Sequence, residues 1–170
     1  MKVSIAKIKA NPLSALDFSF AERLSPSAYG YDGFSLEGPL TVRGRLENRG
    51  DGAFAAELSW QGVVIRQCGR CGQQFSAPVS GSAQVRFTVD DMADAEGEDQ
   101  LWPIDNDEAD LAQAALSEIW FHEPMQPLCR PDCRGLCPVC GVDLNQHSCS
   151  CQVAEIDPRW EKLKDLKFEQ

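Results

Sequence analysis

Eight cysteines constrain this chain of 170 residues more than any other feature, because six of them fall within the 23 residues of 129–151. The other two lie far upstream in the sequence C-G-R-C-G at 68–72, and the cluster repeats this form as C-P-V-C-G at 137–141. A Cys-x-x-Cys-Gly turn aims both sulfurs at one point, while backbone N–H groups bond the thiolates and the glycine accepts a positive φ. Both turns therefore have the form of metal-binding knuckles.

The expected compartment supports metal binding. The first ten residues alternate apolar with basic or small side chains and contain no apolar run of signal-peptide length. No later stretch approaches the roughly 20 apolar residues of a membrane span, so we expect a cytoplasmic protein. Disulfides are rare in a reducing compartment, and a thioredoxin-type pair would begin a helix, which neither turn is expected to do. Zinc ligation is therefore favoured over redox dithiols and structural disulfides.

Eight cysteines suit two tetrahedral sites of four sulfurs, and hence two zinc ions. Low loop-closure cost favours a local site from the last four cysteines and a long-range site from the first four. The rival arrangement joins the two Cys-x-x-Cys-Gly turns in one site, as in zinc ribbons. The predicted ligands are Cys68, Cys71, Cys129, Cys133, Cys137, Cys140, Cys149 and Cys151. His147 is a less favoured substitute for one sulfur, and His122 is expected to have a helix-end or packing role.

The rest of the sequence predicts an α+β fold. Short alternating or β-branched runs between residues 40 and 90, separated by turns at 48–52 and 61–62, indicate an antiparallel meander forming a barrel-like sheet. A helix through 53–60 is the alternative for one run. A strand is also expected at 3–10, followed by a stretch rich in loops up to residue 39.

Two helices are predicted after the meander. Helical spacing of apolar residues indicates one at 108–121, capped by Asn106 or Asp107, and prolines at 124 and 127 end it before the cysteine cluster. A short amphipathic helix is expected after Asp157. We therefore divide the chain into a β-rich domain with helix, residues 1–128, and a cysteine-rich zinc module with C-terminal helix, residues 129–170. A shared zinc site is expected to tie the two together.

Charge is unevenly distributed along the chain. The net charge is −10, but residues 90–118 hold 11 acidic side chains and no Lys or Arg, so the remainder, with 15 acidic and 16 basic residues, is almost neutral. This acidic stretch is expected to begin as a solvated loop, which either attracts basic protein tails or only aids solubility. A basic surface for RNA therefore remains open elsewhere.

Six arginines are the candidates for RNA contact. Two alternate on one predicted strand and so share a face, and four stand beside the cysteines of the long-range site, where they offset thiolate charge. Solvated side chains that only balance charge are the simpler alternative. The candidates are Arg43, Arg45, Arg66, Arg70, Arg130 and Arg134.

Several motifs together resemble a known family. They are C-R-x-D-C-x-G-L-C-P-V-C-G-x-x-L-N followed by C-x-C, the upstream C-x-R-C after a β-rich region, and the closing D-P-R-W-x-x-L-x-x-L. These motifs resemble the bacterial YceD family, the large ribosomal RNA subunit accumulation proteins, over about residues 30–167. The resemblance implies a role in accumulation or processing of 23S rRNA and in ribosome biogenesis, with ribosomal RNA or a basic ribosomal protein as partner.

Catalysis is not expected. Zinc enclosed by four cysteines keeps no open position for water, and the sequence contains no nucleophile, Walker or H-E-x-x-H motif. The expected function is therefore that of a zinc-stabilised binding protein in ribosome biogenesis, with no membrane and no small-molecule substrate. The alternative is a zinc-ribbon-like adaptor between proteins in another machine, such as transcription.

Overall fold

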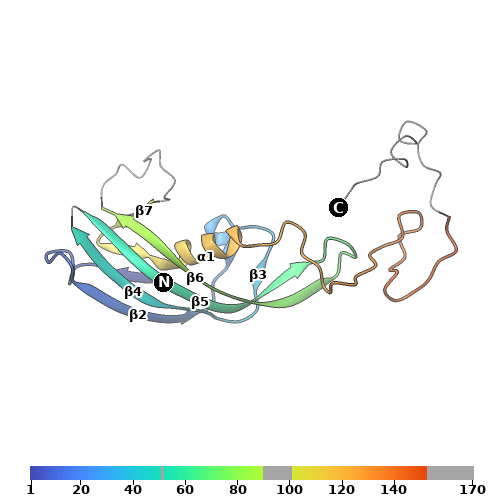
Figure 1. Cartoon of the computed structure of the whole chain (residues 1–170), viewed down its shortest axis with the longest axis horizontal. Helices are drawn as coiled ribbons and strands as arrows, with labels where there is room; N and C mark the ends of the chain where they lie inside the picture. Colours follow the sequence, from blue (N-terminus) through green and yellow to red (C-terminus); the bar gives the residue numbers. More distant parts are fainter. Residues whose placement is uncertain (51, 90–100, 153–170) are drawn as a thin grey trace, which may run out of the picture.

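The computed structural model describes residues 1–50, 52–89 and 101–152 (Figure 1). The predicted acidic loop at 90–100 and the predicted C-terminal helix therefore lie outside the described residues. The elements are β1 (Lys2–Ser4), β2 (Ala15–Glu22), the 3-10 helix η1 (Pro26–Tyr29), β3 (Ser35–Leu36), β4 (Leu40–Gly50), β5 (Ala53–Gln67), β6 (Gln74–Thr88), β7 (Leu101–Asp105), β8 (Glu108–Asp110) and α1 (Leu111–Phe121).

The predicted antiparallel meander is present as β4, β5 and β6. The predicted turn at 61–62 is wrong, because these residues lie inside β5. This strand is 15 residues long and pairs with β6 along its whole length. Gly62 is a packing position instead: a Cβ there would lie 3.0 Å from Leu40 Cδ1. The helical alternative for 53–60 is also wrong, since that segment alternates buried and exposed side chains as a strand does.

The sheet is mixed, which corrects the purely antiparallel prediction. Its order is β1-β8-β7-β6-β5-β4-β2, with β3 beside β5, and β6 and β7 run parallel. Parallel neighbours need a connection of about a dozen residues or more, and the segment between Thr88 and Leu101 has that length. The two ends of the sheet approach each other, since the Met1 amino group lies 3.7 Å from the Glu22 carboxylate. The result is a nearly closed, barrel-like sheet.

The N-terminal forty residues differ from expectation. The predicted strand at 3–10 is limited to β1, after which the chain turns, and the Asn48 side chain donates to the carbonyls of Ile8 and Lys9 at 2.8 and 3.1 Å. The stretch expected to be loops contains β2, which pairs with β4 over eight residues. Its sequence A-L-D-F-S-F-A-E does alternate apolar with polar or small residues, so a signal was present.

Helix α1 is shorter than predicted. Glu108–Asp110 form strand β8, and Asn106 and Asp107 have φ values of 52° and 59°, as required by the tight turn that joins β7 to β8. Asp110 is the N-cap instead, because its side chain accepts from the N–H groups of Ala112 and Gln113. The helix ends at Phe121, before the prolines, as predicted.

One face of α1 closes the core against the sheet. Leu111 and Leu116 of the helix and Leu46, Phe54 and Phe87 of the sheet are at most 2% exposed. Burying each such side chain contributes about 1.5–3 kcal/mol, so this core stabilises the sheet without any metal. Among the described residues, no helix has the length and apolar character that crossing a bilayer requires.

Candidate metal centres

Four cysteines distant in sequence converge beyond the end of the β5–β6 hairpin, and we call them the first centre: Cys68, Cys71, Cys129 and Cys133. Their sulfurs all lie within 4.8 Å of one another, with Cys68 to Cys133 and Cys71 to Cys129 each 3.8 Å apart. A tetrahedron with metal–sulfur bonds of about 2.3 Å has edges of about 3.8 Å. The spacing therefore fits a tetrahedral metal ion, whereas a disulfide needs about 2.05 Å.

The first pair is shaped by the turn between β5 and β6. The N–H of Gly72 donates to the Cys68 carbonyl at 2.9 Å, and the N–H of Cys68 donates to the Gln73 carbonyl at 2.8 Å. Gly72 has a φ of 72°, the left-handed conformation that glycine adopts without a steric penalty. The two sulfurs of C-G-R-C-G thus point to the same side of the turn, as the sequence predicted.

The segment after α1 passes beside this turn and contains the other two cysteines of the first centre, Cys129 and Cys133 (Figure 1). The N–H of Gly69 donates to the Pro127 carbonyl at 2.8 Å, and a Cβ on Gly69 would lie 2.8 Å from Gln126 Cγ. A larger residue at position 69 would therefore have to displace the exposed Gln126 side chain. Cys68 and Cys133 are each 2% exposed, so this centre lies in the interior of the junction.

The second centre consists of Cys137, Cys140, Cys149 and Cys151, whose sulfurs also lie within 4.8 Å of one another. Its turn repeats the first one: Gly141 has a φ of 72°, and its N–H donates to the Cys137 carbonyl at 2.9 Å. The N–H of Val139 lies 3.4 Å from Cys137 Sγ, which is the expected bond to a thiolate. Cys140 and Cys151 are exposed, so this centre lies at the surface.

The thiols differ in acidity within each centre. Backbone N–H groups, first that of Cys129 and then that of Cys71, lower the pKa of Cys68 to about 6. The backbone N–H groups of Cys140 and Val139 lower the pKa of Cys137 to about 6 in the same way. Each centre therefore offers one sulfur that is largely a thiolate at neutral pH, which is the form that binds metals.

Other thiols in the two centres are held protonated. Burial and the neighbouring thiol of Cys133 raise the pKa of Cys129 to about 12. A contact with the Cys140 thiol, followed by burial, raises the pKa of Cys151 to about 12. Four sulfurs this close cannot all carry negative charge without a cation among them.

The favoured grouping of the cysteines is confirmed, and the rival that joined the two turns in one centre is wrong. The long-range centre takes two cysteines from each side of the predicted boundary at residue 128. Neither group contains a histidine within the described part of the chain. His147 is an exposed loop residue, and the Nδ1 of His122 lies 2.8 Å from the Glu118 carbonyl oxygen at the end of α1.

Three of the candidate arginines stand at the first centre and are exposed. Arg70 Nη1 donates to the Cys133 carbonyl at 2.9 Å, and Arg130 Nε lies 3.6 Å from the Asp132 carboxylate. Arg134 contributes its backbone N–H to a side chain of the same loop. Arg66 is not a surface candidate, because it is 12% exposed and its Nη2 lies 2.5 Å from Glu123 Oε1.

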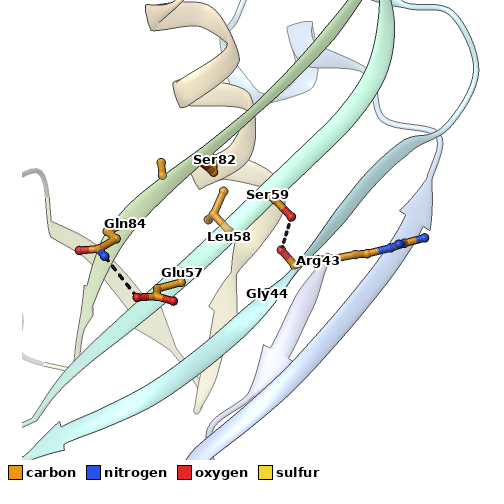
Figure 2. Close-up of a pocket in the computed structure, with 8 residues that line it drawn as sticks. Arg43, Gly44, Glu57, Leu58, Ser59, Ser82 and Gln84 are labelled. Atoms are coloured by element: carbon orange, nitrogen blue, oxygen red, sulfur yellow. Dashed lines mark hydrogen bonds between the residues drawn. The ribbon is translucent and has the colours of Figure 1, made fainter.

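Arg43 and Arg45 form a separate group on the outer face of β4. Figure 2 shows the Arg43 side chain extending away from the hydrogen-bonded Glu57–Gln84 pair in a shallow depression of the sheet. Arg45 lies 3.8 Å from the Asp17 carboxylate. Since Arg43 pairs in register with Ser59, eight strand residues before Gln67, about 26 Å of strand separates it from the first centre. The candidate arginines do not form one continuous stripe.

Three side chains around the centres had no predicted role. Asn145 Nδ2 lies 3.5 Å from Cys133 Sγ, and Asp143 accepts from both Asn145 and Gln73. Asn145 is the last residue of the motif C-P-V-C-G-x-x-L-N, so the sequence did mark this position. The motif does not show which atom the Asn145 amide contacts.

Comparison with known proteins identifies the family. The sequence model described as large ribosomal RNA subunit accumulation protein YceD matches residues 56–167, well over half of the chain. This chain belongs to the YceD family. The match covers β6, α1 and both centres, so the resemblance expected from the cysteine motifs is confirmed.

Relatives with and without a described role align with this YceD chain. Uncharacterized proteins of Mycobacterium tuberculosis and Mycobacterium bovis are 29% identical over 174 residues, covering 98% of this chain and 81% of theirs. A chloroplastic large ribosomal RNA subunit accumulation protein, YCED homolog 1 of Zea mays, is 31% identical over 78 residues, or 45% of this chain and 27% of the maize protein. No solved structure gives a significant match.

Proposed function

We propose that this YceD protein is a non-catalytic zinc-binding protein that supports accumulation and processing of 23S ribosomal RNA during assembly of the large subunit, in the bacterial cytoplasm. The observation that carries the proposal is the family match over residues 56–167. The two groups of four sulfurs support zinc binding. The lack of a free coordination position in a four-sulfur site, together with the exposed arginines beside the first centre, supports a binding role.

Zinc is the metal that suits these donors. Thiolates are soft ligands, and tetrahedral four-sulfur sites are typical of zinc or iron–sulfur centres. The Cys-x-x-Cys-Gly turns, and the 3.8 Å between the sulfurs of Cys68 and Cys133 and of Cys71 and Cys129, match single tetrahedral ions. Two zinc ions per chain are expected, one in each centre.

A structural role fits the zinc sites better than catalysis. Four protein sulfurs complete a tetrahedron and leave no position for the water that catalytic zinc activates. The first centre is also buried, with Cys68, Cys71 and Cys133 at most 6% exposed. Zinc here would join the β5–β6 hairpin to the segment after α1. Its role is to hold a binding surface together, not to catalyse a reaction.

The partner is either ribosomal RNA or a basic ribosomal protein of the large subunit. The exposed Arg70, Arg130 and Arg134 at the first centre are suited to phosphate groups. The acidic stretch at 90–100 suits a basic protein tail by its composition. Variants separate the two: Arg130→Glu/Arg134→Glu should abolish RNA contact, and neutralising Asp94, Glu96, Glu98 and Asp99 should abolish protein contact.

Sedimentation of native cell extract through a density gradient tests the proposal. The protein is expected to migrate with large-subunit precursors, to move to the top after ribonuclease treatment, and to carry about two zinc ions per chain by elemental analysis. Cells depleted of the protein should have a lower ratio of 23S to 16S rRNA than undepleted cells. Unchanged 23S rRNA in depleted cells would remove the ribosomal part of the proposal, and metal-free protein would remove the zinc part.

A further inference from the structure

A hydrogen bond from the loop of the second centre reaches a ligand of the first. Asn145, which lies between Cys140 and Cys149, directs its Nδ2 at the sulfur of Cys133 at 3.5 Å. Its Oδ1 accepts from the backbone N–H of Arg134 at 2.8 Å. An N–H donor at a ligand thiolate stabilises the negative charge and orients the sulfur. One side chain therefore holds both the ligand and the backbone beside it.

Asp143 holds Asn145 in this position. Its Oδ1 accepts from the backbone N–H of Asn145 at 2.9 Å and from Asn145 Nδ2 at 2.7 Å. Its Oδ2 accepts from Gln73 Nε2 at 3.0 Å, and Gln73 belongs to the turn of Cys68 and Cys71. The loop of the second centre is thus bonded to both halves of the first centre.

Backbone contacts bring the two centres together. The N–H of Leu144 donates to the Gly135 carbonyl at 2.9 Å, and the N–H of Leu136 donates to the Arg70 carbonyl at 3.3 Å. Gly135 has a φ of 74°, and a Cβ there would lie 3.0 Å from Arg70 O. Glycine is needed at this position both for the conformation and for the close approach.

From these contacts we infer that Asn145 is a positioning residue that couples the two metal centres. Closing the second centre orders the loop that carries Asn145, and the ordered amide stabilises the Cys133 thiolate, which raises the affinity of the first centre for its ion. The inference rests on the proposed binding of zinc at both centres. Because coupling between binding sites is reciprocal, loading the first centre raises the affinity of the second by the same factor.

Metal titration of the full chain tests this role. Co²⁺ is used as the probe, since sulfur-to-cobalt absorption reports four-thiolate coordination, and Zn²⁺ then displaces it in competition with a chelator of known affinity. Asn145→Ala is expected to weaken the first centre about 10- to 100-fold. Asn145→Asp keeps the size but replaces the donor by a negative charge, so it should weaken binding at least as much. Ser148→Ala, an exposed side chain in the same loop, is the matched control and should leave both affinities unchanged.

A second set of variants tests the coupling. Cys149→Ser/Cys151→Ser removes the second centre, and the first centre is expected to weaken by a factor similar to that of Asn145→Ala. Adding Asn145→Ala to this variant should have little further effect, because the loop no longer holds the amide in place. Unchanged affinity in Asn145→Ala, or additive losses in the triple variant, would overturn the coupling while leaving zinc binding intact. Wild-type protein that binds neither Co²⁺ nor Zn²⁺ would overturn both.

Discussion

At the scale of single residues, unequal acidity of the thiols determines how each centre responds to pH. Cys129 and Cys151, whose pKa values are raised to about 12, must lose a proton before they bind a metal ion, whereas Cys68 and Cys137, with pKa values of about 6, are largely ionised already at pH 7.5. In each centre, backbone N–H groups stabilise one thiolate, whereas another thiol loses its proton only when the metal binds.

Metal binding is therefore expected to release at least about one proton per centre at pH 7.5. Because protons compete with the metal for these sulfurs, apparent affinity should rise with pH and fall on acidification. Titration of the metal-free protein with Zn²⁺ in weak buffer, followed with a pH indicator, measures the released protons. No detectable release at pH 7.5 would contradict the assigned acidities.

The ion pair between Arg66 and Glu123 is the clearest energetic contribution of single residues outside the centres. The two side chains are 12% and 16% exposed, and Arg66 Nε is buried with no hydrogen-bond partner among the described residues. Glu123→Gln leaves the guanidinium without its counter-charge, so the free energy of unfolding should fall by about 2–4 kcal/mol. Urea denaturation of the metal-loaded protein measures this change.

Glu118→Gln is the matched control for this pair. Glu118 lies 3.9 Å from His122, which is 67% exposed, and a pair of this kind contributes at most about 1 kcal/mol. Replacing both partners, as Arg66→Met/Glu123→Leu, should recover much of the stability that Glu123→Gln loses. An equal effect of Glu118→Gln and Glu123→Gln would show that burial of the pair has no energetic role.

At the scale of elements, the length of the β5–β6 hairpin determines where the first centre lies. Both strands have 15 residues, and they continue past the region where β4 and β7 flank them (Figure 1). Trp60 packs over Gly81 of the opposite strand, at a position where a Cβ would lie 2.4 Å from Trp60 Cζ2. The hairpin depends on glycine there because the indole occupies the space of a side chain.

Gly81→Ala should consequently destabilise the protein by about 1–3 kcal/mol, since displacing the Trp60 ring outweighs the smaller gain from restricting the unfolded chain. Ser82→Ala, an exposed neighbour on the same strand, should change stability by less than about 0.5 kcal/mol. Thermal unfolding with Trp fluorescence compares the two. If the Gly81→Ala protein is as stable as the Ser82→Ala protein, the Trp60 ring can move without a loss in the free energy of unfolding.

At the scale of the whole molecule, the sheet and the cysteine region have different sources of stability. The sheet and α1 enclose an apolar core around Phe54 and Phe87, whereas the described residues of the cysteine region contain few buried side chains besides the cysteines. The N-terminal part is therefore expected to stay folded without metal, and the cysteine region is not.

Removing the metal with a chelator under reducing conditions should expose residues 127–152 and the turn at 68–73 to amide hydrogen exchange. The core segments of β5, β6 and α1 should keep their protection, because their buried apolar contacts do not involve the sulfurs. Mass-spectrometric hydrogen exchange of loaded and chelated protein measures both regions. Unchanged protection at 127–152 would show that metal is not needed for this part of the fold.

The sequence by itself predicted the Cys-x-x-Cys-Gly turns, the meander of β4–β6 and helix α1, because each of these depends on local pattern. A Cys-x-x-Cys-Gly turn, an alternating strand and a run at helical spacing involve neighbours in the chain. The grouping of the cysteines was also predictable, since the last four close a short loop and leave the first four to meet.

Only the tertiary structure decided which residues far apart in sequence make contact. The parallel partner of β6, the burial of Arg66 against Glu123 and the reach of Asn145 to Cys133 all join groups whose local sequences hold no information about each other. Arg66 falls in the same alternation as the buried Trp60 and Val64, so the strand pattern indicates its inward face but not its partner Glu123. Long-range packing therefore determined which candidate side chains remained accessible to a partner and which became part of the scaffold.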